Sequence, residues 1–224
     1  MSSNQSSARL LLPLNFIARA QTMSFDILKK LVADRAGERE IQNHLKQNLD
    51  IVGRSCTYSP IAEEYIAFSE FMIQRGKTDF CVFSDRSRMA VTFIEIKGAD
   101  FSFMNQDGSI NVEISEASRQ IRERVEYALT DQFRKEAHEI RRLVLIGKSP
   151  FNHVVGRDRL PHVDPDKPLQ VRSVVIGGFT RDDPEESRER HRLERHDPRT
   201  RYESWDSWIR KNGDIGGSIR NAGT

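Results

Sequence analysis

The sequence predicts an α/β domain, in which helices cover a central β-sheet, and three observations support this. Short runs rich in aromatic and β-branched residues follow Gly53, as is typical of strands. A long charged segment with one apolar face comes next and indicates a helix. Residues 143–147 and 171–179 are apolar on both faces, as strands covered on both sides must be. Helices combined with such covered strands imply an α/β fold.

Two helices are expected before the sheet. Between residues 24 and 48, apolar side chains recur every three or four positions, which is the period of an amphipathic helix. These positions are Phe25, Leu28, Leu31, Val32, Ile41 and Leu45. Gly37 interrupts the pattern, so we expect it to separate the two helices.

The sheet itself is expected to begin as an antiparallel meander. Strand-like runs cover residues 65–73, 79–83 and 89–96. The polar stretch 84–88 between the last two runs is typical of a hairpin loop. Three consecutive strands joined in this way pair with their neighbours in the chain.

A helix, a strand and a charged segment are expected to follow. One long helix is predicted from residue 112 or 113 to about residue 141, and residues 143–147 are predicted to form the next strand. Residues 181–201 hold seven arginines and seven acidic residues, a mixture typical of a solvated helix or loop. Three aromatic residues at a spacing of three come next. We expect them to dock a short helix on the core rather than to stack bases; they are Tyr202, Trp205 and Trp208.

Length and composition limit the class of protein. The chain has 224 residues, 37% hydrophobic and 30% charged, which suffices for one substantial domain. No run approaches the roughly 18 apolar residues of a membrane-spanning helix, and no secretory signal is recognisable, so a cytoplasmic protein with no membrane partner is predicted. The formal net charge of +2 allows a local positive cleft but not a surface that is basic all over. Cys56 and Cys81 have no companion ligands at zinc spacing and are expected to be core residues.

One folded domain is expected between two less ordered ends. Residues 1–23 begin with a run rich in Ser, Asn and Gln and are expected to be partly disordered. Residues 212–224 contain four glycines and are expected to form a flexible tail. The domain is therefore predicted to span residues 24–211.

Two acidic residues and a lysine interrupt the apolar strands. Alternation along the strand places Glu95 and Lys97 on one face, opposite Ile94 and Ile96. Asp79 opens the preceding strand, so it is expected at the same end of the sheet as Glu95, which closes the antiparallel neighbour. Burial of either charge without a partner is costly, so these groups need solvent, each other or a metal.

This group of side chains fits the chemistry of a divalent metal. The carboxylates of Asp79 and Glu95, with the backbone carbonyl of Ile96, suit a hard cation such as Mg2+, with Mn2+ as a substitute. Lys97 can then orient or deprotonate an attacking water while the metal neutralises charge on a phosphate, so the site could hydrolyse a phosphodiester. The structural alternative is that Glu95 and Lys97 form a surface ion pair and that Asp79 caps a turn.

The order of these elements and motifs resembles a known group of enzymes. Asp79, a spacer and then Glu95-Ile96-Lys97 are similar to the motif of the PD-(D/E)XK nuclease superfamily, which includes type II restriction enzymes, although Thr78 stands where the signature has proline. More narrowly, four segments resemble the nuclease domain of the Shedu (SduA-like) bacterial antiphage defence proteins over about residues 34–211. They are Glu40-Ile41-Gln42-Asn43-His44-Leu45, Phe93-Ile94-Glu95-Ile96-Lys97, Arg142-Leu143-Val144-Leu145-Ile146-Gly147 and Thr200-Arg201-Tyr202-Glu203-Ser204-Trp205.

The resemblance implies a restriction-endonuclease-like core, with a central mixed β-sheet flanked by helices, and a role for each site residue. Asp79 and Glu95 would hold the metal, and Lys97 would be the catalytic lysine. The family also uses a glutamate on the first helix, and two residues fit: position in the motif favours Glu40 as the further catalytic and metal-binding residue, whereas helical phase favours Glu38.

The resemblance also points to Gln120, on the predicted long helix, as a polar residue directed at the site. The expected activity is that of a Mg2+-dependent deoxyribonuclease that cuts DNA in antiphage defence and forms a homo-oligomer, either a dimer or a tetramer. One alternative is a non-catalytic or activator-dependent nucleic-acid-sensing module that assembles into oligomers. Another is an assembly protein that binds copies of itself through the face of Trp205 and Trp208.

Overall fold

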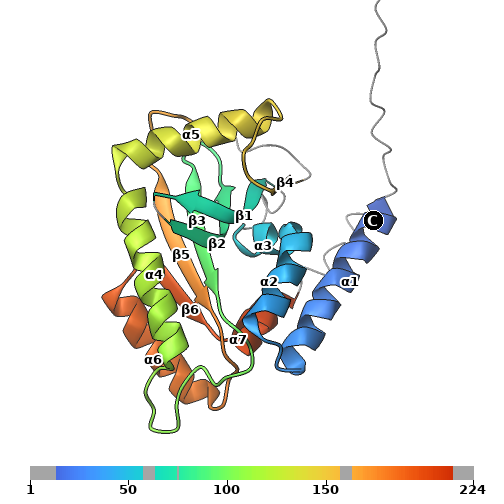
Figure 1. Cartoon of the computed structure of the whole chain (residues 1–224), viewed down its shortest axis with the longest axis vertical. Coiled ribbons are helices and arrows are strands. Elements are labelled where there is room, and N and C mark those ends of the chain that lie inside the picture. Colours follow the sequence, from blue (N-terminus) through green and yellow to red (C-terminus); the bar gives the residue numbers. More distant parts are fainter. Residues whose placement is uncertain (1–13, 58–63, 75, 157–162, 214–224) are drawn as a thin grey trace, which may run out of the picture.

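A six-stranded mixed β-sheet with helices on both faces lies at the centre of the computed structural model, which describes residues 14–57, 64–74, 76–156 and 163–213 (Figure 1). The strand order is β4-β1-β2-β3-β5-β6. Pairing is antiparallel from β4 to β3 and parallel from β3 to β6, so the α/β class with a central mixed sheet is confirmed. The strands are β1 (Tyr65–Ile73), β2 (Gly76–Ser84), β3 (Ala90–Ile96), β4 (His153–Val155), β5 (Gln170–Ile176) and β6 (Thr200–Glu203).

Two apolar cores lie on the two faces of the sheet. One forms between the sheet and helices α4 and α5, and the other forms between the sheet and helices α1, α2, α3 and α7 (Figure 1). The side chains of successive strand residues therefore enter different cores, as the period of two requires. The helices are α1 (Leu14–Ala33), α2 (Glu38–Gln47), α3 (Leu49–Ser55), α4 (Val112–Ala128), α5 (Asp131–Leu145), α6 (Asp183–His196) and α7 (Trp205–Lys211).

The first half of the chain largely follows the sequence prediction. Gly37 separates α1 from α2, with an extended backbone at the N-cap of α2, so the two-helix prediction is confirmed. The strand predicted at residues 65–73 has those bounds, and the meander is antiparallel. Helix α1 begins ten residues earlier than the predicted start at residue 24. Residues 1–13 and 214–224, where disorder was predicted, lie outside the described residues.

The predictions for the middle of the chain were wrong in two places. The single long helix is two helices, because Thr130 starts α5 as its N-cap by accepting a hydrogen bond from the Phe133 amide at 3.2 Å. Residues 143–147 are not a strand, since α5 continues to Leu145. Val144 is buried there, whereas Leu145 and Ile146 are each 49% exposed. A short apolar run has the same appearance in a buried strand and at the end of an amphipathic helix.

The end of the chain confirms the docking prediction for Trp205 and Trp208 but not for Tyr202, which lies in β6 and packs in the core on the other face of the sheet. The charged segment forms α6, and Trp205 and Trp208 of α7 are 0% and 4% exposed. The Trp205 indole also donates a hydrogen bond to the Lys97 carbonyl at 2.8 Å. Both tryptophans are therefore buried in the core, and their face is not accessible to a second copy of the chain. None of the helices in the described ranges combines the length and apolar character needed to cross a membrane.

Gly53 allows α3 to lie close against β1. A Cβ atom at this position would fall 2.2 Å from Cε2 of the buried Tyr65 ring. We expect Gly53→Ala to lower the free energy of unfolding by about 1–3 kcal/mol, because overpacking outweighs the gain of about 1 kcal/mol in helix propensity. Urea denaturation measures this, with Gly213→Ala as the control, since a Cβ there has no neighbour within 4 Å. Equal stability of the two variants would contradict the packing account.

Candidate active site

Asp79 and Glu95 lie where β2 and β3 stop pairing. The strand register ends with Phe80 opposite Ile94, and the next step in the same register brings Asp79 opposite Glu95. There the Ile96 amide donates a hydrogen bond to Asp79 Oδ2 at 2.9 Å, so a side chain takes the place of a ladder bond. Asp79 is inside β2 and does not open it as predicted, but the predicted proximity of the two carboxylates is confirmed.

Glu95 is a buried carboxylate that is not fully satisfied. It is only 6% exposed, and among the described residues its Oε2 atom has no hydrogen-bond partner. Burial, and then repulsion from Asp79, raise the pKa of Glu95 to about 8, although Arg124 and Lys97 oppose this rise. The alternative of an exposed Glu95–Lys97 pair is therefore wrong. A cation bound at Oε2 would supply the missing partner.

Asp79 is held by two hydrogen bonds from different elements. Gln42 of α2 donates from Nε2 to Asp79 Oδ1 at 2.5 Å, and the Ile96 amide binds the other oxygen. Burial raises the pKa of Asp79, Glu38 raises it further, and the two hydrogen bonds oppose the change. Each carboxylate oxygen can accept a second interaction, so Asp79 remains able to bind a metal.

Helix α2 brings Glu38, and not Glu40, to the site. Glu38 and Gln42 are one helical turn apart, so they share the face that meets Lys97 and Asp79. Glu38 Oε2 lies 3.3 Å from Lys97 Nζ. Glu40 is about 200° around the helix from Glu38 and is exposed. Helical phase therefore predicted which glutamate faces Lys97 better than position in the motif did.

Lys97 is fixed at the end of β3 with its charge paired to Glu38. Its side chain is 13% exposed, its amide donates to the Ile176 carbonyl at 2.7 Å, and its carbonyl accepts from Trp205. Burial alone would lower the pKa of Lys97, but the ion pair with Glu38, together with the charges of Glu95 and Asp79, outweighs burial and the net pKa is raised. The lysine is thus held in its ammonium form by the surrounding carboxylates.

Helix α4 contributes an arginine that sequence reasoning missed. Arg124 donates from Nε and Nη2 to the Lys77 carbonyl at 2.9 and 2.6 Å, and its charge lowers the pKa of Glu95. Gln120 accepts from Arg124 through its backbone carbonyl. In the part of the chain that is described, the Gln120 amide donates to Glu116 of its own helix at 3.4 Å. No sequence pattern identified Arg124, because its approach to the site depends on how α4 docks against the sheet.

The donor set fits a cation that keeps part of its water shell. Across the described ranges, no three His, Cys, Asp or Glu side chains are grouped to hold a metal ion by themselves. Mg2+ needs only one or two protein carboxylates and retains several waters. Asp79 and Glu95, one of them with an unsatisfied buried oxygen, meet that requirement.

Comparison with known proteins agrees with this architecture. The sequence model of the family described as Shedu protein SduA, C-terminal, matches residues 35–209, which is most of the chain. The match covers every element from α2 to β6 and most of α7. A comparison with curated proteins gives no match. The chain therefore belongs to the Shedu SduA C-terminal family.

Proposed function

We propose that the chain is a metal-dependent nuclease of the PD-(D/E)XK type that hydrolyses DNA phosphodiester bonds in bacterial antiphage defence. The buried and unsatisfied Glu95 carboxylate, beside Asp79 and followed by Lys97, carries this proposal. Buried acidic pairs with perturbed pKa values are typical of functional sites. Membership of the Shedu family supports the defence role.

The carboxylates are positioned by the fold before any ligand binds. Gln42 and the Ile96 amide fix both oxygens of Asp79, and the strand register fixes Glu95 beside it. These two residues and the Ile96 carbonyl would hold Mg2+, or Mn2+ in its place, which when bound would neutralise charge on the phosphate. Ligands held on strands keep their geometry better than ligands on loops.

The charge on Lys97 determines the role that this side chain can take. While the ion pair persists, the charged Lys97 can orient an attacking water or donate to a phosphate oxygen. Glu38, Glu95 and Asp79 all raise the pKa of Lys97, so the site favours the ammonium form. We therefore infer that Lys97 acts as a cation that positions the water and the phosphate, and that Glu38 holds Lys97 in place.

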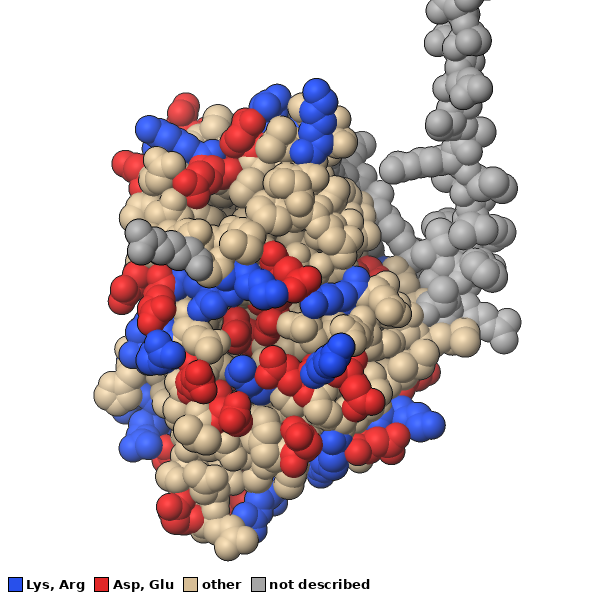
Figure 2. All heavy atoms as spheres, viewed as in Figure 1, with Lys and Arg blue, Asp and Glu red and all other residues tan. Residues whose placement is uncertain are grey.

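Local cations, and not an extended basic surface, would bind the DNA backbone. Lys and Arg are interspersed with Asp and Glu on the face shown in Figure 2, in keeping with the net charge of +2. Near Asp79, however, Lys46 and Lys77 both pair with Glu70 at 3.3 and 2.5 Å. Together with Arg124 they provide positive charge for phosphates beside the carboxylates.

We expect the two helix glutamates to behave differently when each is replaced. Glu38→Gln should reduce the rate of DNA cutting by about tenfold to a hundredfold, because it removes the Lys97 counter-ion and a charge near both carboxylates. Glu40→Gln should stay within about twofold of the unmodified protein, since an exposed residue on the far face is replaced. Initial rates of plasmid cutting measure both. A larger loss in Glu40→Gln than in Glu38→Gln would reverse the assignment.

A panel of substrates tests the proposed activity. The purified protein is incubated with supercoiled, linear and single-stranded DNA in Mg2+, in Mn2+ and in EDTA, beside an Asp79→Asn variant. We expect cutting that needs the metal and is lost in the variant, and the panel shows which form of DNA is preferred. Cutting that persists in EDTA or in Asp79→Asn would contradict the proposal. Light scattering on the same sample tests the predicted dimer or tetramer.

One observation favours a second candidate, an activator-dependent nucleic-acid-sensing module. Burial and Asp79 raise the pKa of Glu95 to about 8, so near neutral pH this carboxyl must lose a proton before it can bind a metal. Such a protein would show a Mg2+-dependent rise in melting temperature and would bind DNA without cutting any substrate in the panel. Cutting by the protein alone would exclude this candidate.

A further inference from the structure

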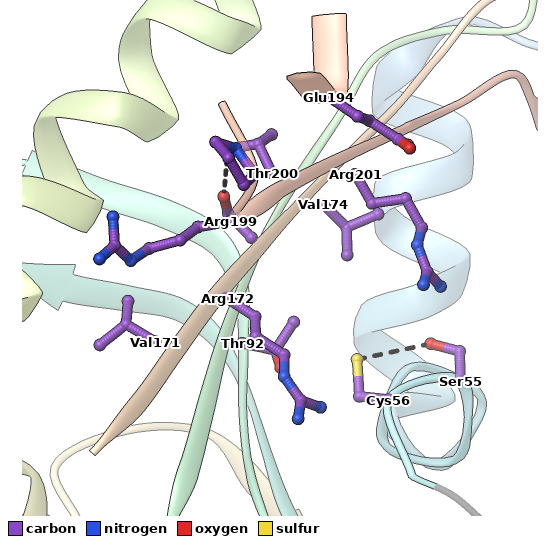
Figure 3. Close-up of a pocket in the computed structure, with 12 residues that line it drawn as sticks. Ser55, Cys56, Thr92, Val171, Arg172, Val174, Glu194, Arg199, Thr200 and Arg201 are labelled. Atoms are coloured by element: carbon purple, nitrogen blue, oxygen red, sulfur yellow. Dashed lines mark hydrogen bonds between the residues drawn. The ribbon is translucent and has the colours of Figure 1, made fainter. Parts of the chain in front are cut away.

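A polar pocket opens near the β6 edge of the sheet. It has a volume of about 340 Å³ and lies where the first residues of β5 precede the start of β6 (Figure 3). Pairing of β6 with β5 starts at Ser173 opposite Thr200, so Val171 and Arg172 extend beyond the last strand. The C-terminal end of α3, at Ser55 and Cys56, forms the opposite wall.

Positive charge dominates this pocket. Arg172 and Arg201 point to the same side of the strands, toward the end of α3 (Figure 3). Arg172 donates to the neutral side-chain amide of Gln170 at 2.9 Å. Arg201 lies 3.9 Å from Glu203, and Lys211 binds that same carboxylate oxygen at 2.7 Å. The two guanidinium groups therefore retain donors for an anion.

The positive charge of the pocket also acts on the thiol of Cys56 in the opposite wall. Burial raises the pKa of its thiol to about 11, and the charges of Arg172, Arg201 and Lys211 oppose this rise. The positive charges of these three side chains therefore converge on the Cys56 side of the pocket. Glu194, the acidic residue of the lining, already accepts a hydrogen bond from the Tyr202 amide at 3.2 Å.

The remaining lining is partly apolar, which suggests that the ligand carries an apolar group in addition to a phosphate. Val171, Val174 and Pro198 border the arginines. Arginine forks recognise phosphate oxygens by paired hydrogen bonds, and aliphatic side chains contact a base or sugar. The volume is at the lower end of the range for small-molecule sites and suits a ligand of nucleotide size.

The pocket is separate from the carboxylate site. Thr92 lines it from β3 and is three residues before Glu95, so the two side chains point to opposite faces of the sheet. We propose that this pocket is a binding site for a free nucleoside phosphate, with the phosphate on Arg172 and Arg201 and the nucleoside against Val174 and Pro198. This proposal is independent of the nuclease activity.

Calorimetric titration of the full chain with ADP and with adenosine tests the proposal. We expect ADP to bind, adenosine not to bind, and the double variant Arg172→Gln/Arg201→Gln to bind ADP about tenfold or more weakly, because charged hydrogen bonds are lost. Arg188→Gln, an exposed arginine of α6, is the matched control and should bind like the unmodified protein. If the double variant does not fold, the single variant Arg201→Gln, whose side chain is 49% exposed, replaces it.

Labelling of Cys56 gives a second readout that does not depend on heat of binding. Cys81 is fully buried, so a small neutral thiol reagent at alkaline pH should react first at Cys56. ADP should slow this labelling in the unmodified protein and not in the arginine variants. ADP binding that is unchanged in those variants, adenosine binding as strong as that of ADP, or the absence of both binding and protection would each overturn the proposal.

Discussion

Lys97→Ala is expected to lower the rate of DNA cutting by about 10²–10⁴-fold while DNA binding is retained. The substitution removes the ammonium that lies beside both carboxylates and pairs with Glu38 at 3.3 Å, but it leaves Asp79 and Glu95 in place. Initial rates of plasmid cutting measure the loss. Fluorescence anisotropy with labelled DNA measures binding.

The matched control for this variant is Lys135→Ala. Lys135 is an exposed lysine of α5, so its removal takes away one positive charge without touching the site. We expect its cutting rate to stay within about twofold of the unmodified protein. Full activity in Lys97→Ala would remove the mechanism, and an equal loss in both variants would show that the effect is one of net charge.

Glu95→Gln is expected to inactivate the protein and also to stabilise it in the absence of metal. The amide cannot replace a carboxylate as a ligand for a hard cation, so cutting should be lost. The same change removes a buried charge that has an unsatisfied oxygen and that repels Asp79. A substitution is expected to raise stability and abolish activity when the replaced residue destabilises the fold but is needed for function.

The gain in stability should depend on pH in a defined direction. The pKa of Glu95 is raised from about 4.5 to about 8 in the folded protein, so the folded state binds the proton more tightly than the unfolded state. The protonated Glu95 carboxyl makes its full contribution to the free energy of unfolding below pH 4.5, and this contribution is lost as the pH rises through 8. In EDTA, Glu95→Gln should therefore match the unmodified protein near pH 5 and exceed it by about 2–4 kcal/mol near pH 8.

Urea denaturation in EDTA at several pH values checks this expectation, with Glu126→Gln, an exposed residue of α4, as the control. Addition of Mg2+ should then stabilise the unmodified protein and leave Glu95→Gln unchanged. A stability difference that does not vary with pH would show that the Glu95 proton is not involved. Equal stabilisation of both proteins by Mg2+ would place the cation elsewhere.

The fold was predictable where local patterns and tertiary packing agree. The β1–β2–β3 meander follows from alternation and aromatic content, and its strands have the expected order and pairing. The break between α4 and α5 was missed because no glycine or proline marks it and Thr130 acts only through its cap. The short parallel edge strand β6 has no sequence signal, since four residues are too few to show a period.

The candidate site was predictable only in part. The proximity of Asp79 and Glu95 follows from strand direction, which the sequence indicates. Helical phase also favoured Glu38, but the hydrogen bond from Gln42 and the approach of Arg124 depend on how α2 and α4 dock against the sheet. Docking angles arise from packing of whole faces, and single-sequence patterns do not encode them.

The central claim is that Asp79 and Glu95 form a metal site that cuts DNA, and one measurement tests it most directly. Supercoiled plasmid is incubated with the unmodified protein and with Glu95→Gln, each in Mg2+ and in EDTA, and conversion to nicked or linear DNA is followed over time. We expect conversion only by the unmodified protein in Mg2+. Conversion by Glu95→Gln at the unmodified rate, or conversion in EDTA, would contradict the claim.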